Sequence, residues 1–367
     1  MYLLPKPKTI KEQDGQMLLC HSTHIVMTKE VAETEMHAAK RLQEAIRQET
    51  GLILPFSVGE VREGDLSLGI AKTLPEQTYE ITIDEKGGQI SGGDGAGVLY
   101  GVETFCQIVQ QCGGILPCVQ IQDAPDMPNR GYYFDQTRGR VLKLEELKKI
   151  ADRMCRYKLN QLQLYVEHTY LFRDFSEMWR DQTPLTAEEI LELDSYCRER
   201  HIELVPSLAS FGHLCTLLST KTYGDLCEME DSWKEPFSFW NRMRYHTINV
   251  SDERSLPLIK KMIAEYMQLF SSNKFNICAD ETFCLGKYKS KKLAEERGVH
   301  RLYIDYVKEL AQFLVENGKI PMFWGDIIWN SPELMKELPE SMICLNWGYA
   351  PEQREDETRA IAQTGAV

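Results

Sequence analysis

From Arg130 onward, segments with strand character alternate with segments of helical periodicity, and this alternation is the feature that most restricts the fold. Repeated strand-then-helix units of this length predict a parallel sheet with helices packed outside it. The predicted strands are Gly131–Asp135, Gln161–Glu167, Ile202–Leu208, Phe275–Asp280, Pro321–Trp324 and Met342–Trp347. The predicted helices are Leu144–Tyr157, Ala187–Arg200, Leu256–Phe270, Leu302–Asn317, Pro332–Leu338 and Glu352–Gln363.

Polar and aromatic residues stand just after several of these strands, which favours a (β/α)₈ barrel of the TIM type, an α/β fold. The alternative is a doubly wound, Rossmann-like sheet, but no Gly-rich fingerprint follows a first strand. A closed barrel needs eight strands, and six parallel strands would leave two open edges. We therefore expect that only about six β/α units are present and that the 367 residues are a fragment lacking strands 7 and 8.

Residues 1–125 show a different pattern and predict a smaller α+β domain before the barrel of residues 126–367. A helical pattern runs from Glu30 to Glu49 and ends at Gly51, while Leu66–Ile70 and Tyr79–Ile83 alternate like half-buried strands. The glycine-rich stretch 92–97 matches neither dinucleotide nor phosphate-loop spacing and predicts a tight turn before a helix. The proline-containing stretch 123–128 marks the boundary between the domains.

Charge and cysteine content exclude several classes of function. With 42 Lys plus Arg against 55 Asp plus Glu, the net charge is −13, which argues against a partner such as nucleic acid or an anionic membrane. The eleven cysteines include no C-x-x-C pair, and the N-terminus shows no apolar signal core, so we expect reduced thiols in a cytoplasmic protein. His21 and His24 lack a third ligand nearby, and we expect no metal and no cofactor.

Chemistry in a barrel belongs at the carboxyl ends of its strands. The fourth predicted strand ends in the adjacent carboxylates Asp280 and Glu281, and His213 follows the third strand. Two carboxyl groups held side by side divide their ionisation, so that one can donate a proton while the other stabilises positive charge. Without other context, such a pair is more typical of a solvated strand end.

Further candidates follow the other strands. Glu167 and His168 close the second strand, Asp135 and Arg138 close the first, and Trp324 and Trp347 end the fifth and sixth. Buried tryptophans are more often simple core, but two at successive strand ends can form the walls of a sugar pocket. Together with the acid pair, these residues indicate a carbohydrate substrate.

The order of several motifs resembles glycoside hydrolase family 20, the β-N-acetylhexosaminidases. The segment Arg130-Gly131-Tyr132-Tyr133-Phe134-Asp135 resembles that family's first barrel strand. The stretches Lys158-Leu159-Asn160, Gly212-His213 and Ala279-Asp280-Glu281 then follow in the family's order and spacing. The first domain resembles the α+β domain that precedes the family's barrel, so the resemblance covers nearly the whole chain.

The resemblance implies an exo-acting enzyme that removes terminal β-linked N-acetylglucosamine or N-acetylgalactosamine with retention of configuration. Glu281 then resembles the general acid/base, and Asp280 the residue that orients the substrate's 2-acetamido group, whose oxygen attacks the anomeric carbon. His213 resembles the histidine that supports the acid/base. Arg130 resembles the arginine that binds the distal hydroxyls, and Trp324 and Trp347 resemble pocket tryptophans.

The sequence departs from the family at two strand ends. Asn276-Ile277-Cys278 stands where members commonly carry His-x-Gly, and the second strand ends in Glu167-His168 instead of the usual acidic pair. Either Glu167 or His168 could therefore be a substrate-binding residue or the partner of His213. Two alternatives to the hexosaminidase remain open. One is a non-catalytic sugar-binding protein, and the other is a retaining glycosidase in which Asp280 or Glu167 is the nucleophile.

Overall fold

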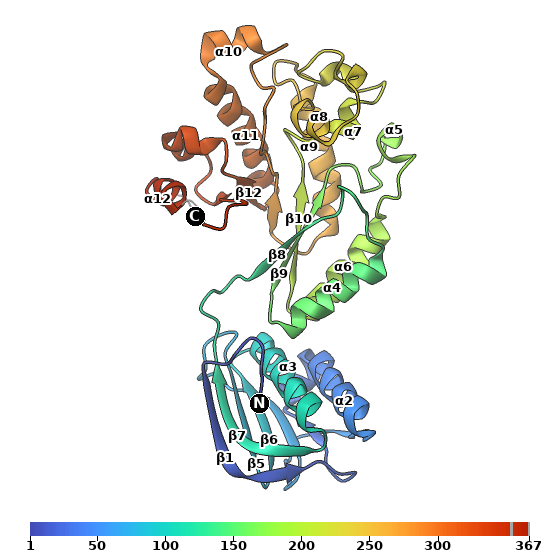
Figure 1. Ribbon diagram of the computed structural model, residues 1–367, viewed down its shortest axis with the longest axis vertical. Coiled ribbons are helices and arrows are strands. Elements are labelled where there is room, and N and C mark those ends of the chain that lie inside the picture. Colours follow the sequence, from blue (N-terminus) through green and yellow to red (C-terminus); the bar gives the residue numbers. More distant parts are fainter. Residues whose placement is uncertain (353–354, 366–367) are drawn as a thin grey trace. The chain divides into compact units, whose positions relative to one another are not determined.

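The computed structural model of the protein describes residues 1–352 and 355–365 (Figure 1). The chain forms two compact units. The first contains Met1–Tyr132 together with Glu145–Gln161 and Ser195–Glu203. The second contains Tyr133–Leu144, Leu162–Asp194 and the chain from Leu204 onward. The predicted domain boundary after residue 125 lies in the connection between the last strand of the first sheet and the first strand of the second, and it stays a prediction.

The first unit is built on a seven-stranded mixed sheet in the order β1-β7-β5-β6-β4-β2-β3. Helices α2 and α3 lie side by side and cover one face of this sheet (Figure 1). The alternation of buried and half-exposed residues in β5 shows why one face is buried while the other stays polar. The strands are β1 (Thr9–Leu18), β2 (Ile25–Met27), β3 (Phe56–Val58), β4 (Leu66–Ile70), β5 (Tyr79–Asp84), β6 (Gly87–Gly92) and β7 (Ile115–Asp123), and the helices are α1 (Lys29–Thr34), α2 (Met36–Thr50) and α3 (Gly95–Cys112).

The helix predicted from Glu30 to Glu49 is interrupted. It forms as α1 and α2, with Glu35 between them in a non-helical conformation and its carboxylate 2.8 Å from His201 Nε2. The periodicity continues across the break, so hydrophobic spacing alone did not reveal it. Gly51 ends α2 in the left-handed conformation, as the sequence predicts.

The glycine-rich turn before α3 is confirmed. Asp94 Oδ1 caps the helix by accepting from the Gly97 N–H at 2.7 Å. A Cβ atom on Gly97 would stand 2.3 Å from the carbonyl oxygen of Thr78, so glycine is required by close packing of the backbone. The turn therefore needs no phosphate ligand to explain its composition.

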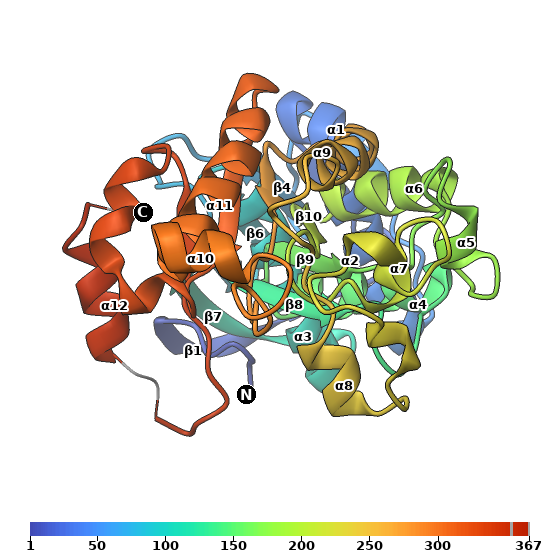
Figure 2. The same ribbon diagram turned by 90° about the horizontal axis from the view of Figure 1, so that it is seen from above.

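The second sheet has six strands in the order β13-β12-β11-β10-β9-β8, and the neighbouring strands from β10 to β13 are parallel. Figure 2 shows its strands β8, β9 and β10. The strands are β8 (Gly131–Asp135), β9 (Gln161–Val166), β10 (Glu203–Leu208), β11 (Lys274–Asn276), β12 (Ile320–Trp324) and β13 (Ile343–Leu345). The predicted partial barrel of the TIM type, preceded by a smaller α+β unit, is confirmed. The main departure is that β11 ends at Asn276, four residues before its predicted end.

Helices connect these strands in sequence. They are α4 (Leu144–Arg156), α5 (Ser176–Trp179), α6 (Ala187–Arg198), α7 (Cys215–Leu218), α8 (Phe239–Arg244), α9 (Ser255–Tyr266), α10 (Lys291–Arg297), α11 (Val299–Glu316) and α12 (Glu355–Ala362), with the 3₁₀ helix η5 at Pro332–Glu337. Thr186 and Glu189 cap the start of α6 reciprocally, at 2.9 and 3.2 Å. Helix α11 buries one apolar face beside α9 and β12. None of the helices described in this chain combines the length and apolarity that crossing a bilayer requires.

Candidate active site

A cavity of about 240 Å³ opens at the carboxyl ends of the barrel strands. Acidic, basic and aromatic side chains share its wall, and its lining residues come from all six strands or the loops that follow them. The lining residues are Tyr133, Asp135, Arg138, Tyr165, Met243, Asp280, Glu281, Trp324, Trp347, Gly348 and Tyr349. The predicted acid pair and both predicted tryptophans therefore meet at one cavity.

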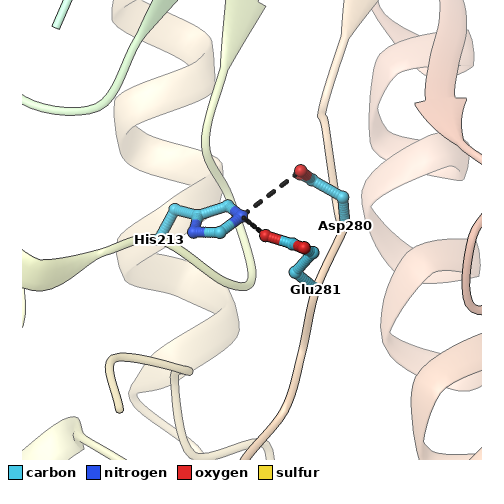
Figure 3. Close-up of side chains that lie close together, drawn as sticks. All are labelled: His213, Asp280 and Glu281. Atoms are coloured by element: carbon cyan, nitrogen blue, oxygen red, sulfur yellow. Dashed lines mark ion pairs between the residues drawn. The ribbon is translucent and has the colours of Figure 1, made fainter. Parts of the chain in front are cut away.

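His213 stands between the two carboxylates of the acid pair (Figure 3). Its Nε2 atom lies 3.3 Å from Asp280 Oδ2 and 3.3 Å from Glu281 Oε2, and the side chain is almost fully buried. Burial alone would lower the pKa of this imidazole, but the two carboxylates raise it to about 9. His213 is therefore a buried cation at neutral pH, and it ties both carboxylates to one point.

The backbone that carries the acid pair is strained. Cys278, Ala279 and Glu281 all have left-handed φ angles, of 57°, 62° and 49°. Non-glycine residues adopt this conformation at a cost of about 1–3 kcal/mol each and keep it only where the surroundings hold it, which is common at active sites. Here the Cys278 carbonyl accepts from Trp324 N at 2.8 Å, and the Ala279 carbonyl accepts from the Tyr303 hydroxyl at 3.0 Å.

The loop that bears His213 approaches the acid pair because Gly212 precedes it. A Cβ atom at Gly212 would stand 2.6 Å from the backbone oxygen of Asp280, a distance that real Cβ atoms do not show. His213 itself has a left-handed φ of 59°. Glycine at position 212 is thus the local reason that the histidine reaches both carboxylates.

Glu167 lies in a buried ionic network and does not line the cavity. Its Oε1 accepts from Arg138 Nε and from the Tyr165 hydroxyl, both at 3.0 Å, and its Oε2 accepts from Arg242 Nη2 at 2.9 Å. Burial would raise the pKa of this carboxyl group, but Arg242 and Arg138 bring it below its ordinary value. The two arginines and Tyr165 occupy the oxygens of Glu167, so its predicted substrate-binding role has no direct contact with the cavity to support it and stays a prediction.

His168 is likewise absent from the cavity wall. Its Nδ1 lies 3.2 Å from the Thr216 hydroxyl, and burial lowers the pKa of its imidazole. The ion-pair partners of His213 are Asp280 and Glu281, and the charge of His213 also contributes to lowering the pKa of Glu167. The suggestion that Glu167 or His168 is the partner of His213 stays a prediction.

Arg130 lies outside the cavity wall. Its guanidinium donates to the carbonyl oxygens of Met127, Pro128 and Lys158 at 2.6–3.1 Å, and it is not among the cavity-lining residues. Arg130 precedes β8, whereas Arg138 follows the strand and lines the cavity. The predicted role of Arg130 in binding sugar hydroxyls stays a prediction.

Two residues of the site received no role from the sequence. Arg242 belongs to the short helix α8 in the long connection between β10 and β11, and no strand signal points to it. Asp326 follows β12 and accepts the Glu281 N–H at 3.0 Å. The sequence Trp324-Gly325-Asp326 after the fifth strand could have identified Asp326 by the same strand-end argument that selected Trp324.

Aromatic rings form the remaining wall. Trp324 contacts Tyr133 edge-to-face, with ring centroids 5.1 Å apart, and Trp347 contacts Tyr349 at 5.5 Å. Tyr349 is 93% exposed at the mouth of the cavity. Such rings present flat apolar faces, which suits them to packing against the C–H face of a pyranose.

His213, Asp280 and Glu281 also form the one group of three potential metal-ligating side chains found in the described chain, with donor atoms within 4.8 Å of one another. The histidinium between two carboxylates accounts for this grouping by charge alone, and we interpret it as an ion-pair cluster.

Comparison with known proteins agrees with this geometry. Residues 1–124 match the model of "Glycosyl hydrolase family 20, domain 2", and residues 128–366 match that of "Glycosyl hydrolase family 20, catalytic domain". The chain belongs to glycosyl hydrolase family 20. The catalytic-domain match alone covers more than half of the chain.

Curated relatives in this family include a beta-hexosaminidase of Porphyromonas gingivalis, 24% identical over 363 residues, which cover 89% of this chain and 45% of that protein. A beta-hexosaminidase of Vibrio furnissii is 26% identical over 310 residues, which cover 76% of this chain and 48% of the relative. The chain therefore spans about half the length of these relatives.

Solved structures share the fold at low identity. The beta-N-acetylhexosaminidase of Bacteroides fragilis superposes with a TM-score of 0.79 at 19% identity, over 99% of this chain and 74% of that one. A mutant Streptomyces plicatus beta-hexosaminidase in complex with its product, GlcNAc, gives a TM-score of 0.81 at 19% identity, over 98% and 71%. At this identity the likeness establishes the fold.

Proposed function

We propose that the protein is an exo-β-N-acetylhexosaminidase that removes terminal β-linked N-acetylglucosamine or N-acetylgalactosamine with retention of configuration. The observation that carries the proposal is the cluster of His213, Asp280 and Glu281 on the wall of an aromatic-lined cavity. Beta-hexosaminidases among its family relatives support the same activity.

In the proposed mechanism Glu281 protonates the glycosidic oxygen. Asp280 orients the 2-acetamido group and stabilises the positive charge that develops as the acetamido oxygen attacks the anomeric carbon. Bond cleavage gives an oxazolinium intermediate, and Glu281, now ionised, accepts a proton from the water that opens it. The His213 cation lies within 3.3 Å of both carboxyl groups and holds them in place throughout.

The substrate pocket has complementary parts. Arg138 offers a planar donor fork suited to sugar hydroxyls, while Trp324 and Trp347 provide apolar faces. Carbohydrate is the proposed partner. A cytoplasmic location remains part of the proposal, supported by eleven cysteines that are all free.

The test is hydrolysis of an aryl β-N-acetylglucosaminide by the purified protein, compared with the matching aryl β-glucoside, which lacks the acetamido group. We expect hydrolysis of the first only, together with inhibition by GlcNAc-thiazoline, a mimic of the cyclic intermediate. Glu333→Gln, which removes an exposed carboxylate of η5, is the control for variants of this chain that lose a carboxylate at the site.

Other outcomes identify the alternatives. Binding of GlcNAc without turnover would indicate a sugar-binding protein. Turnover of both substrates, without thiazoline inhibition but with a trapped sugar–protein adduct, would indicate a protein nucleophile. Of the two candidate nucleophiles, Asp280 lines the cavity, whereas Glu167 is enclosed by Arg138 and Arg242.

A further inference from the structure

Asp326 is a carboxyl group that lies behind the acid pair rather than on the cavity wall. It follows β12 and is partly buried, and its Oδ2 atom accepts the Glu281 N–H at 3.0 Å. Its other oxygen, Oδ1, is buried and, apart from the small electrostatic effect of the Trp347 indole, has no hydrogen-bond partner among the described residues. A buried carboxylate oxygen without a partner is costly, which makes this position unusual for a purely structural residue.

Several ionisable groups face Asp326 from the surrounding elements. Asp280 and Glu281 lie on the segment after β11, Tyr303 on α11 and Cys344 on β13. Burial and the charge of Asp280 raise the pKa of Asp326 to about 7, against smaller opposing effects of the Glu281 N–H and the Trp347 indole. The carboxyl group therefore changes charge near neutral pH, where a glycosidase of this kind would operate.

The hydrogen bond between Asp326 and Glu281 also bears on the backbone conformation of Glu281. Glu281 has a left-handed φ of 49°, and its N–H points to Asp326. A hydrogen bond to a carboxylate is stronger than one to a neutral acceptor, so it suits the task of holding a strained residue. The direction in which the Glu281 side chain leaves the backbone is set by this contact.

We propose that Asp326 is a positioning residue that holds Glu281 in its strained conformation and, through its charge, sets the upper pH limit of the acid pair. The proposal rests on the proposed function and specifies how that site is regulated. Ionised Asp326 adds negative charge behind the acid pair, which favours retention of the proton on Glu281 as the pH rises.

Two substitutions separate the two parts of the role. Asp326→Asn keeps an oxygen that can accept the Glu281 N–H but removes the charge, whereas Asp326→Ala removes both. Glu333→Gln is the matched control, since it removes one exposed carboxylate elsewhere in the same unit. The readouts are kcat and KM for an aryl β-N-acetylglucosaminide between pH 4 and 10.

For Asp326→Asn we expect at least a third of the plateau kcat, with the alkaline limb of the pH–rate profile moved down by about one pH unit. For Asp326→Ala we expect kcat to fall about tenfold or more while KM changes less than about threefold, because bound substrate meets a misplaced acid. The control should keep the wild-type profile.

Equal losses in both variants with an unmoved alkaline limb would mean that Asp326 only fills space, and wild-type profiles in both would mean that it has no role. Either result overturns the proposal. If Asp326→Ala fails to fold, the Asp326→Asn profile alone decides.

A protein without hydrolase activity would defeat the proposed function, so the inference also needs a readout independent of turnover. Carboxyl ¹³C titration of protein labelled at Asp and Glu supplies it. We expect one aspartate that titrates near neutral pH and disappears in Asp326→Asn, with a second carboxyl group shifting to a lower midpoint in that variant. Absence of the near-neutral signal, or no shift of any other carboxyl, would overturn the inference.

Discussion

The amino and carboxyl ends of the barrel strands treat the same kinds of charged residue differently. Arg130, directly before β8, is bound by three backbone carbonyl oxygens. Arg138, three residues after the same strand, is bound by Glu167 and also lines the cavity. At the amino end, Arg130 stabilises the backbone of its own chain. At the carboxyl end, Arg138 is fixed by Glu167 and is also exposed to the cavity, where it can bind a ligand.

Buried polar atoms without hydrogen bonds follow the same division. In the part of the chain that the structure describes, four such atoms belong to residues around the site, namely Nδ1 of His213, Nε of Arg242, Oδ1 of Asp326 and Nε1 of Trp347, whereas Nε2 of His213 is held by its two ion pairs. Buried polar groups are nearly always paired in folded proteins. Their concentration at one end of the sheet therefore marks it as the functional end.

The largest test of this division is removal of the acid pair. We expect Glu281→Gln to lower kcat/KM by about 10²–10⁴ on substrates with poor leaving groups, and much less on activated ones that need no protonation. Asp280→Asn should lose a similar factor on both, because formation of the intermediate itself is impaired. Glu203→Gln, at the amino end of β10, should stay within about threefold of the wild type. Equal loss from Glu281→Gln on both substrate types would exclude it as the acid.

Arg138 and Arg130 allow a matched comparison, whose expected effects are smaller than those of removing the acid pair. Arg138→Lys keeps a charge beside Glu167 but loses the planar fork, and we expect kcat/KM to fall about 100-fold with little change in the free energy of unfolding. Arg130→Lys should do the reverse, lowering the free energy of unfolding by about 1 kcal/mol at nearly wild-type kcat/KM. Kinetics and urea unfolding of both variants decide the matter, and a larger kinetic loss in Arg130→Lys would invert the comparison.

The last effect falls on stability rather than on activity, and it depends on pH. The pKa of His213 is about 9 in the folded chain, above the value of roughly 6.5 expected after unfolding. The folded state thus binds the proton more tightly. The stabilisation is fully present below pH 6.5 and is lost as the pH rises through 9, by at most about 3 kcal/mol. Urea unfolding at pH 6.5, 8 and 9.5 measures this. His213→Asn should flatten the decline, and an unchanged slope in that variant would assign it to other groups.

Much of the fold was predictable because its signals are local. Strand β8 and strand β4 form over the predicted residues, and the capping pair Thr186 and Glu189 forms as expected. The break at Glu35 and the early end of β11 depend on contacts distant in the sequence, which periodicity does not record. The acid pair left the strand because Cys278 and Ala279 adopt left-handed angles that their residue types do not announce.

The site residues that directly follow a strand could be predicted from the sequence. Whether a given side chain points into the cavity or into the interior of the protein could not. Strand-end position correctly brought Trp324, Trp347, His213 and the acid pair to one place. It could not separate Glu167 from Asp280, since only the structure shows which carboxylate is enclosed by arginines. Arg242 comes from a long connection, and its approach to Glu167 has no sequence signal.

The left-handed angles at Cys278, Ala279 and Glu281 also bear on how fast the proposed sugar ligand would be bound. Because these residues are fixed by contacts within the chain, the conformational entropy of aligning the carboxylates is lost during folding and not during association. Encounter with the cavity mouth, instead of a slow rearrangement of this segment, is then expected to limit the association rate. The three left-handed φ angles thus lower the stability of the fold, and because they are already fixed before binding, they favour a fast association rate.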